Sequence, residues 1–209
     1  MDAVTALERC GGVATAAELL TWTTRRRVRR AVRSGSIARL ARGRYALPGT
    51  PDTRAQAARL TAVVCLRSAA AAHGWKLKTM PDRPELAVRP NRKVAGERWE
   101  GVRVAWLDLI EDEVVGGVTT ALRTVLDCAR QLPFDEALAV ADSALRSGQV
   151  TREELAELHV RGAGASAVRR VLLHADGRAA NPFESVLRAL CIEAGLVVEA
   201  QLAIQHPRG

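Results

Sequence analysis

Apolar and polar positions follow a helical period in a short stretch that begins after Thr24. Val28, Ala31 and Val32 have the i, i+3, i+4 spacing that places side chains on one face of a helix. The remaining positions of this stretch carry Arg25, Arg26, Arg27, Arg29, Arg30 and Arg33. The pattern therefore predicts a helix that buries one narrow face and presents arginines on all the others.

The ends of this helix are marked by residues with known capping chemistry. Thr23 or Thr24 can serve as the N-cap, because a threonine oxygen accepts a backbone N–H that has no partner inside the helix. Gly35 can end the helix, because glycine readily adopts the left-handed conformation common after a last turn. Beyond it, the sequence predicts two short strands within residues 37–48, joined by a turn at residues 42–44.

Two further helices are predicted before the arginine-rich helix. Residues 4–10 carry the apolar spacing of the first one. The second begins at Thr15, and Glu18 follows three residues later in the pattern of a capping box. Three short helices followed by a two-stranded hairpin are typical of a winged helix-turn-helix, which we assign to residues 1–49.

The rest of the chain is predicted to be a mostly helical α+β body. Alternating residues predict strands at 85–89 and 102–106, with a polar loop between them. Helices are predicted at 53–64, 69–73, 118–132, 133–145, 151–158, 166–174 and 183–194, and a final strand at 196–204. Ser68, Thr151 and Asn181 are the N-caps expected for the helices at 69–73, 151–158 and 183–194. The expected fold class is thus α+β, with the winged helix-turn-helix, an α+β body at residues 53–175 and an incomplete helix–strand piece at residues 181–209.

Positive charge is concentrated at the N-terminal end. The 209-residue chain carries a net charge of +8, and residues 1–50 hold 10 arginines against 3 acidic residues. No acidic residue lies between Leu19 and Pro51. Like charges at helical spacing repel one another, and a polyanion relieves that repulsion while it releases counterions. The pattern indicates a nucleic-acid interface; a basic helix that is merely solvated, or that meets an acidic protein, is the alternative.

We expect double-stranded DNA to be the partner of this module. The N-terminal half of a recognition helix makes most base contacts, so Arg25, Arg26 and Arg29 are the candidates for the major groove. The hairpin arginines are assigned to phosphates or to the minor groove. The full set of candidate DNA-binding residues is Thr24, Arg25, Arg26, Arg27, Arg29, Arg30, Arg33, Arg39, Arg42 and Arg44.

Other residues with reactive or metal-binding side chains lack the spacing of a site. The four cysteines lie far apart and predict free thiols rather than a metal centre. His73 stands alone at a predicted helix end and is interpreted as structural. The acidic residues at 108–113 do not match a calcium loop, so a solvated loop is the favoured interpretation. We expect no metal, no cofactor and no catalytic residue.

The sequence also predicts where the protein is found. No cationic segment precedes an apolar one at the N-terminus, so no signal peptide is expected. The longest apolar region, residues 55–75, is interrupted by charges and is too polar to span a membrane. A reduced cytoplasmic setting is expected. Aromatic residues make up 3% of the chain, which argues against a stacking surface for single-stranded nucleic acid.

Several segments resemble AbiEi-type antitoxins and transcriptional regulators. The most specific are Gly43–Pro48, Arg67–Gly74 and Thr119–Asp127, and the resemblance covers roughly residues 1–175. It implies an N-terminal winged helix that binds operator DNA as an autorepressor, and a remainder that supports pairing of subunits or a partner's function. Some members of the family pair with a nucleotidyltransferase-type toxin, so such a toxin and a second copy of the chain are candidate partners.

The C-terminal segment resembles the start of a Vsr-like endonuclease domain of the PD-(D/E)xK fold. The resemblance rests on Asn181–Arg188, Glu193–Gly195 and Glu199–Gln201, and implies that Glu184 corresponds to the helix acid of that motif. Such enzymes need a further aspartate and a Glu-x-Lys on later strands to hold the metal that activates water. The chain ends before these residues, so we expect no nuclease activity. A DNA endonuclease is the alternative to the regulator, and a helix-start acid that favours the amide dipoles is the alternative for Glu184.

Overall fold

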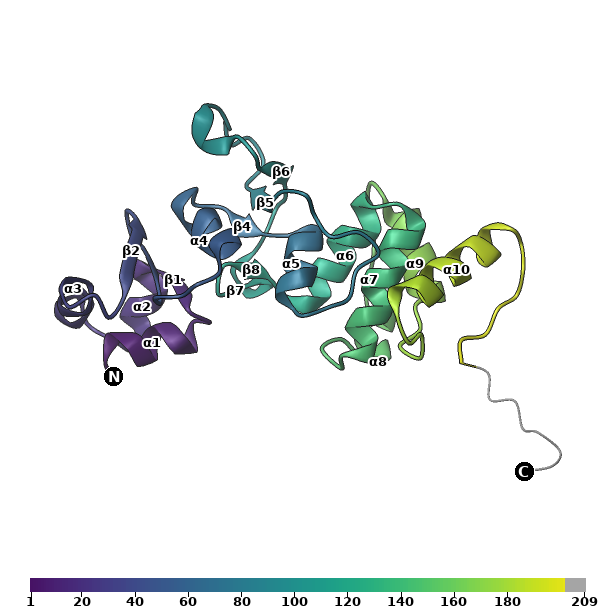
Figure 1. Cartoon of the computed structure of the whole chain (residues 1–209), viewed down its shortest axis with the longest axis horizontal. Helices are drawn as coiled ribbons and strands as arrows, with labels where there is room; N and C mark the ends of the chain where they lie inside the picture. Colours follow the sequence, from purple (N-terminus) through teal and green to yellow (C-terminus); the bar gives the residue numbers. More distant parts are fainter. Residues whose placement is uncertain (202–209) are drawn as a thin grey trace, which may run out of the picture. The chain divides into compact units, whose positions relative to one another are not determined.

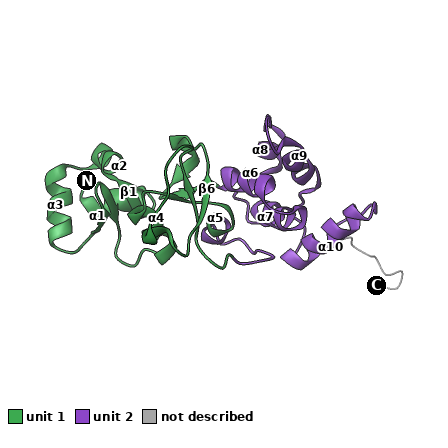
Figure 2. Cartoon of the chain, turned by 90° about the horizontal axis from the view of Figure 1, so that it is seen from above, with its two compact units in different colours: residues 1–69, 81–120 green, residues 70–80, 121–209 purple. Residues whose placement is uncertain are grey.

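The computed structural model describes residues 1–201 and shows an α+β protein, with ten α-helices and two small sheets in that range. The chain divides into two compact units (Figure 2). One comprises residues 1–69 and 81–120, and the other comprises residues 70–80 and the chain from residue 121 on. The α+β class is confirmed. The unit boundary lies inside the body assigned to residues 53–175, and the three-part domain division stays a prediction.

The first unit begins with three helices and a three-stranded sheet (Figure 1). These elements are α1 (Ala3–Arg9), β1 (Val13–Thr15), α2 (Ala16–Trp22), α3 (Arg25–Arg33), β2 (Ala38–Ala41) and β3 (Arg44–Ala46). The strands are antiparallel in the order β1-β3-β2. The three helices and the hairpin are confirmed close to their predicted positions. The sequence pattern does not predict β1, because three residues are too few to show alternation.

The three helices enclose a small apolar core. Leu7, Leu19 and Val28 are buried there, one from each helix. The capping box predicted at the start of α2 is confirmed: the Thr15 hydroxyl accepts the Glu18 N–H, and the Glu18 carboxylate accepts the Thr15 N–H. Local capping and the buried apolar side chains of the three helices thus place α3 against α1 and α2.

The rest of the first unit is built around a five-stranded sheet. The elements, with η for a 3₁₀-helix, are α4 (Asp52–Arg59), β4 (Val63–Val64), α5 (Leu66–Ala72), β5 (Glu85–Val88), η1 (Glu97–Trp99), β6 (Arg103–Trp106), η2 (Glu111–Glu113), β7 (Val114–Val115) and β8 (Val118–Thr119). The strand order is β6-β5-β4-β8-β7, and β5 runs parallel to β6. The last residues of α5 belong to the second unit. The strands predicted at 85–89 and 102–106 are confirmed as β5 and β6.

Two predictions about this region are wrong. The helix predicted at 53–64 ends at Arg59, because the residues that follow pair with β5 and β8 as strand β4. Ser68 is not an N-cap, because it lies inside α5 and its Oγ accepts the Glu85 N–H at 2.9 Å. In both cases a partner distant in sequence decides the local structure.

Arg54 of α4 links the two halves of the first unit. Its Nε donates to the Gly116 carbonyl oxygen at 3.1 Å, and its Nη2 donates to the carbonyl oxygens of Gly11 and Gly116. Burial lowers the pKa of this guanidinium from its ordinary value, but the group stays charged. Gly116 has a φ of +58°, and a Cβ there would lie 2.8 Å from the Gly11 carbonyl oxygen. The close approach of these two backbones therefore requires glycine.

The second unit is helical. It contains α6 (Ala121–Gln131), α7 (Phe134–Arg146), α8 (Arg152–Ala156), α9 (Ala165–His174) and α10 (Pro182–Glu193). Helix α7 packs against α6, α9 and α10. The N-caps predicted at Thr151 and Asn181 are confirmed. The helix predicted from residue 118 begins at Ala121 instead, because residues 118–119 form β8 in the first unit.

A buried ion pair holds α10 against α7. Arg188 Nη1 donates to Asp142 Oδ2 at 2.7 Å, and its Nη2 donates to the His174 carbonyl oxygen at 2.6 Å. Asp142 is fully buried, and its Oδ1 accepts the Asp176 N–H at 2.6 Å. Burial raises the pKa of Asp142 to about 6, although these hydrogen bonds and the Arg188 charge oppose the rise.

Three further sequence predictions are settled only for the described part of the chain. The strand predicted at 196–204 is wrong there, because residues 196–201 form no strand; residues 202–204 lie outside the described range. None of the four cysteines, which all lie within residues 1–201, forms a disulfide, in agreement with the predicted thiols. No helix within residues 1–201 is both long enough and apolar enough to cross a membrane.

Replacing Gly116 with alanine should destabilise the first unit. The new Cβ would meet both the Gly11 carbonyl oxygen and the Arg54 guanidinium, and Gly116 already has a positive φ. We expect a loss of about 1–3 kcal/mol in the free energy of unfolding, measured by urea denaturation. Gly101→Ala is the matched control, because Gly101 has a φ of +71° and nothing within 4 Å of its added Cβ. Equal losses in the two variants would contradict the role of the close approach.

The Asp142–Arg188 pair predicts a pH dependence for the second unit. Between about pH 4 and pH 6 the folded chain holds a proton on Asp142 that the unfolded chain, with its ordinary pKa of 3.8, releases. This stabilising contribution is therefore complete below pH 4 and is lost as the pH rises through 6. We would compare the free energies of unfolding of the native chain and of Asp142→Asn. The difference, native minus variant, should fall by up to about 3 kcal/mol from pH 4 to pH 7. A difference that rises with pH in urea denaturation would show that the Arg188 charge outweighs burial.

Candidate nucleic-acid interface

Helix α3 is formed as its sequence predicts. Thr24 is the N-cap, and its Oγ1 accepts the Arg27 N–H at 3.4 Å. Val28 is buried in the core between the helices, while Ala31 and Val32 are partly buried against it. Since the apolar residues occupy one face, the six arginines are left on the remaining surface of the helix.

The arginines of α3 are exposed and lack acidic partners. Each of the six side chains is exposed to solvent. Within the described residues, no carboxylate lies within 4.0 Å of these guanidinium groups or of the hairpin arginines. Among the arginines of α3, the Arg27 side chain has a hydrogen-bond partner in the described structure: its Nη1 donates to the Met1 carbonyl oxygen at 2.6 Å. The positive charge of this surface is therefore not neutralised by the described part of the chain.

Helix and hairpin arginines converge on a shared depression. One hollow of about 410 Å³ is lined by Arg25 and Arg29 of α3 together with Arg39 and Arg42 of the hairpin. An adjoining hollow of about 650 Å³ is lined by Arg25, Arg26, Arg29, Arg33 and Arg39. Tyr45 of β3 lines both hollows, although the sequence analysis does not single it out. It directly follows Arg44 in the sequence and pairs with Arg39 of β2, and this place beside hairpin arginines is the signal that could have identified it.

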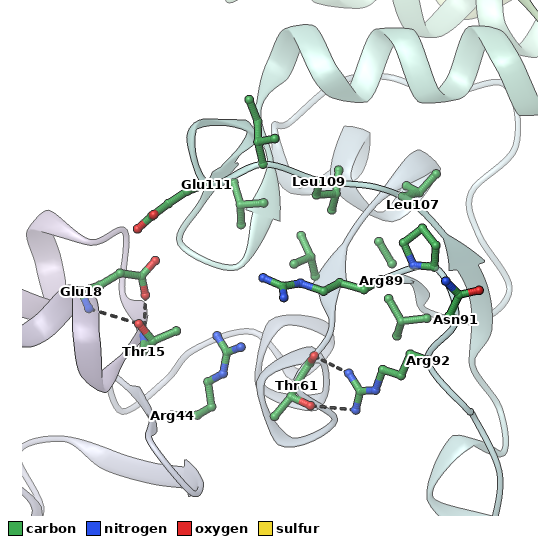
Figure 3. A pocket seen from close by; sticks show the side chains of 16 residues that line it. Thr15, Glu18, Arg44, Thr61, Arg89, Asn91, Arg92, Leu107, Leu109 and Glu111 are labelled. Atoms are coloured by element: carbon green, nitrogen blue, oxygen red, sulfur yellow. Dashed lines mark hydrogen bonds between the residues drawn. The ribbon is translucent and has the colours of Figure 1, made fainter. Parts of the chain in front are cut away.

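The structure separates four candidate residues from this depression. Arg44 precedes Tyr45 on β3, and neighbouring strand residues point to opposite faces of a sheet. Arg44 accordingly lines a different cavity, of about 690 Å³ (Figure 3). Arg27 and Arg30 line neither of the two hollows, and Thr24 serves as the cap of α3.

Glu184, the residue matched to an endonuclease acid, acts at a helix start in the described structure. Its Oε2 accepts the Ala180 N–H and the Gln201 Nε2–H, both at 2.8 Å. These two hydrogen bonds lower the pKa of the Glu184 carboxyl below its ordinary value. No group of three or more His, Cys, Asp or Glu residues suited to a metal ion occurs among residues 1–201.

The comparisons with known proteins give relatives without an assigned function. No family model matches the chain. The uncharacterized proteins Rv2248 and MT2308, from two strains of Mycobacterium tuberculosis, are each 34% identical to it over 188 residues. Each match covers 83% of this chain and 66% of the relative, so the chain spans just under two thirds of the length of these curated relatives.

One solved structure shows a distant likeness. The crystal structure of the RV2827C protein from Mycobacterium tuberculosis matches 94% of this chain and 81% of that chain, with a TM-score of 0.43 and 16% sequence identity. A likeness at this level carries no argument about function. The functional proposal below therefore rests on the residues of the chain itself.

Removing the N-cap should destabilise the arginine helix. In Thr24→Ala the Arg27 N–H loses its acceptor, and a helix of mutually repelling arginines depends strongly on its cap. We expect a loss of about 1 kcal/mol in the free energy of unfolding, measured by urea denaturation. Thr21→Ala is the control, because Thr21 is exposed inside α2 and caps no helix. A loss in Thr24→Ala no larger than in Thr21→Ala would show that the cap is dispensable.

Proposed function

We propose that the N-terminal residues 1–49 form a winged helix-turn-helix that binds double-stranded DNA, and that the protein is an AbiEi-type transcriptional regulator. Helix α3 serves as the recognition helix, and strands β2 and β3 form the wing. The single observation that carries the proposal is the depression in which unneutralised arginines from both elements meet.

The charge of this surface suits a polyanion. A guanidinium without an acidic partner is hydrated in the free chain. When it contacts a phosphate, counterions condensed on the DNA are released, and this release favours binding. Arginine also suits both kinds of contact that a duplex offers, because its planar fork can bind a phosphate or the O6 and N7 edge of guanine. A surface on two adjoining elements whose charged residues are all arginines thus supports both affinity and some sequence preference.

The positions of the arginines divide the proposed contacts. Arg25, Arg26 and Arg29 lie in the first half of α3, where a recognition helix usually meets base edges. Arg39 and Arg42 on the hairpin face the same depression and are assigned to the sugar–phosphate backbone. The sequence-based assignment of Arg44 to the same DNA contact has less support, because its side chain lines another cavity.

An autorepressor is the form of regulation that the family resemblance suggests, with a second copy of the chain and a nucleotidyltransferase-type toxin as proposed partners. The endonuclease alternative receives no support from Glu184. Its Oε2 accepts hydrogen bonds from the Ala180 N–H and the Gln201 side-chain amide at the start of α10. An acidic protein remains the competing partner for the arginine surface, and a DNA-binding measurement separates it from a duplex.

Charge removal on α3 should weaken DNA binding. We would measure fluorescence anisotropy of a labelled duplex from the region upstream of the gene, at several salt concentrations and with or without magnesium. The double variant Arg25→Gln/Arg29→Gln should lose affinity at least about 10-fold, and the slope of log affinity against log salt should become shallower by about 2 if both residues contact phosphates.

Arg98→Gln/Arg161→Gln is the matched control, because both side chains are exposed, lie outside α3 and remove the same charge. Equal effects in the two double variants would mean that net charge alone governs binding. No binding by the native chain at low salt would refute the proposal and favour an acidic protein partner. Cleavage that requires magnesium would support the endonuclease instead.

A further inference from the structure

A further cavity of the first unit, lined by Arg44, lies on the other side of β3 from the arginine depression. It has a volume of about 690 Å³, within the range of small-molecule sites. Figure 3 shows Arg44 of β3 and Arg89, which follows β5, extending toward the middle of this cavity. The cavity is thus lined from both of the sheets that Arg54 holds together.

The two central guanidinium groups have no partner in the described structure. Neither Arg44 nor Arg89 forms a side-chain hydrogen bond or an ion pair within residues 1–201. Arg92, in the same lining, is fully engaged: its Nη1 donates to the Thr61 carbonyl oxygen at 2.6 Å, and its Nη2 donates to the Leu60 carbonyl oxygen at 2.7 Å. Arg92 therefore shapes the wall, whereas Arg44 and Arg89 are available to a ligand.

The remaining lining limits the chemistry of that ligand. Apolar side chains form much of the wall: Val63, Val88, Leu107, Leu109, Ile110 and Val114. Two carboxylates also line the cavity, and that of Glu18 already accepts the Thr15 N–H of the capping box. Glu111 is exposed, and Figure 3 shows its carboxylate on the same side of the view as Glu18. A ligand that suits these walls has an apolar body and an acidic group placed between the two arginines.

We propose that this cavity binds a small organic anion, with Arg44 and Arg89 holding its carboxylate or phosphate, and that its occupancy changes DNA binding. The coupling runs through β3, because Arg44 lines the cavity and the adjacent Tyr45 lines the arginine depression. A shift of the β3 backbone at one of these residues also moves the other, because the two are adjacent in a three-residue strand. The binding site stands by itself, whereas the regulation rests on the proposed DNA-binding function.

Probe binding tests the site without DNA. Anilinonaphthalene sulfonate carries an acidic group on an apolar body and fluoresces when bound, and phenylnaphthylamine has the same kind of body without the acid. The native chain should bind the sulfonate at one saturable site, and Arg89→Gln should weaken this binding about 10-fold or more because a charge-assisted contact is lost. Arg98→Gln, an exposed arginine outside the cavity, should leave it unchanged.

Three results would overturn the site. Equal affinity of Arg89→Gln and the native chain would place the probe elsewhere, for example on the exposed apolar residues of α10. Unweakened or tighter binding of phenylnaphthylamine would show that the arginines do not recognise the acidic group. Weaker DNA binding by Arg89→Gln in the absence of probe would make the cavity an extension of the DNA-binding surface.

The coupling has its own measurement. Saturating sulfonate probe should change the duplex affinity of the native chain about 5-fold or more, and should leave that of Arg89→Gln unchanged at the same probe concentration. An unchanged affinity in the native chain would refute the coupling alone. A native chain that binds the probe but no DNA would refute the proposed function and the coupling together, while the ligand site would stand.

Discussion

The contact of Arg54 with two glycine carbonyl oxygens is the constraint on which the first unit depends. Gly11 lies before β1 of the first sheet, and Gly116 lies between β7 and β8 of the second. Their carbonyl oxygens repel one another at close range unless a cation lies between them. Burial strengthens both this repulsion and the attraction of each oxygen to the cation. The planar guanidinium of arginine has several donors in fixed positions, so it can donate to both oxygens at once. The ammonium group of lysine lacks this fixed geometry and would hold the two oxygens less specifically. The two sheets therefore behave as one body with walls that can enclose a cavity.

Strand β3 is where this constraint meets the proposed functions. It pairs with both β1 and β2, so its side chains are held on two defined faces. Tyr45 faces the arginine depression and Arg44 faces the cavity, which gives three residues of backbone two chemical roles. The arginines of the depression form no ion pair within residues 1–201, and the chain has no acidic residue between Leu19 and Pro51, so this surface is open to an external anion.

Local chemistry explains what the sequence could predict. The capping box at Thr15, the N-cap of α3 and its buried Val28 each involve residues at most four positions apart, so spacing alone identifies them. Strands β4, β7 and β8 have two residues each, too few for a period. Strands β4 and β8 are distant in sequence and pair with each other, and β7 pairs with β8 across the turn at Gly116 and Gly117. Arg44 shows the same limit at the candidate site: composition groups it with the other arginines, but the face of β3 on which it lies depends on sheet pairing.

The C-terminal helix illustrates how a resemblance in sequence can have a structural explanation. The Asn181–Arg188 part of the segment similar to an endonuclease domain contains two charged residues, and both have partners within α10's own unit. The Glu184 carboxylate accepts the Ala180 N–H at the start of the helix, and the Arg188 guanidinium donates to the buried Asp142 carboxylate. Removing either partner of such a buried pair leaves an uncompensated charge, which is reason enough for these residue types at these positions. A nuclease would need Glu184 free to bind a metal ion, so the observed contacts favour a scaffold role for α10, and the proposed DNA binding is assigned to the arginine surface of the first unit alone.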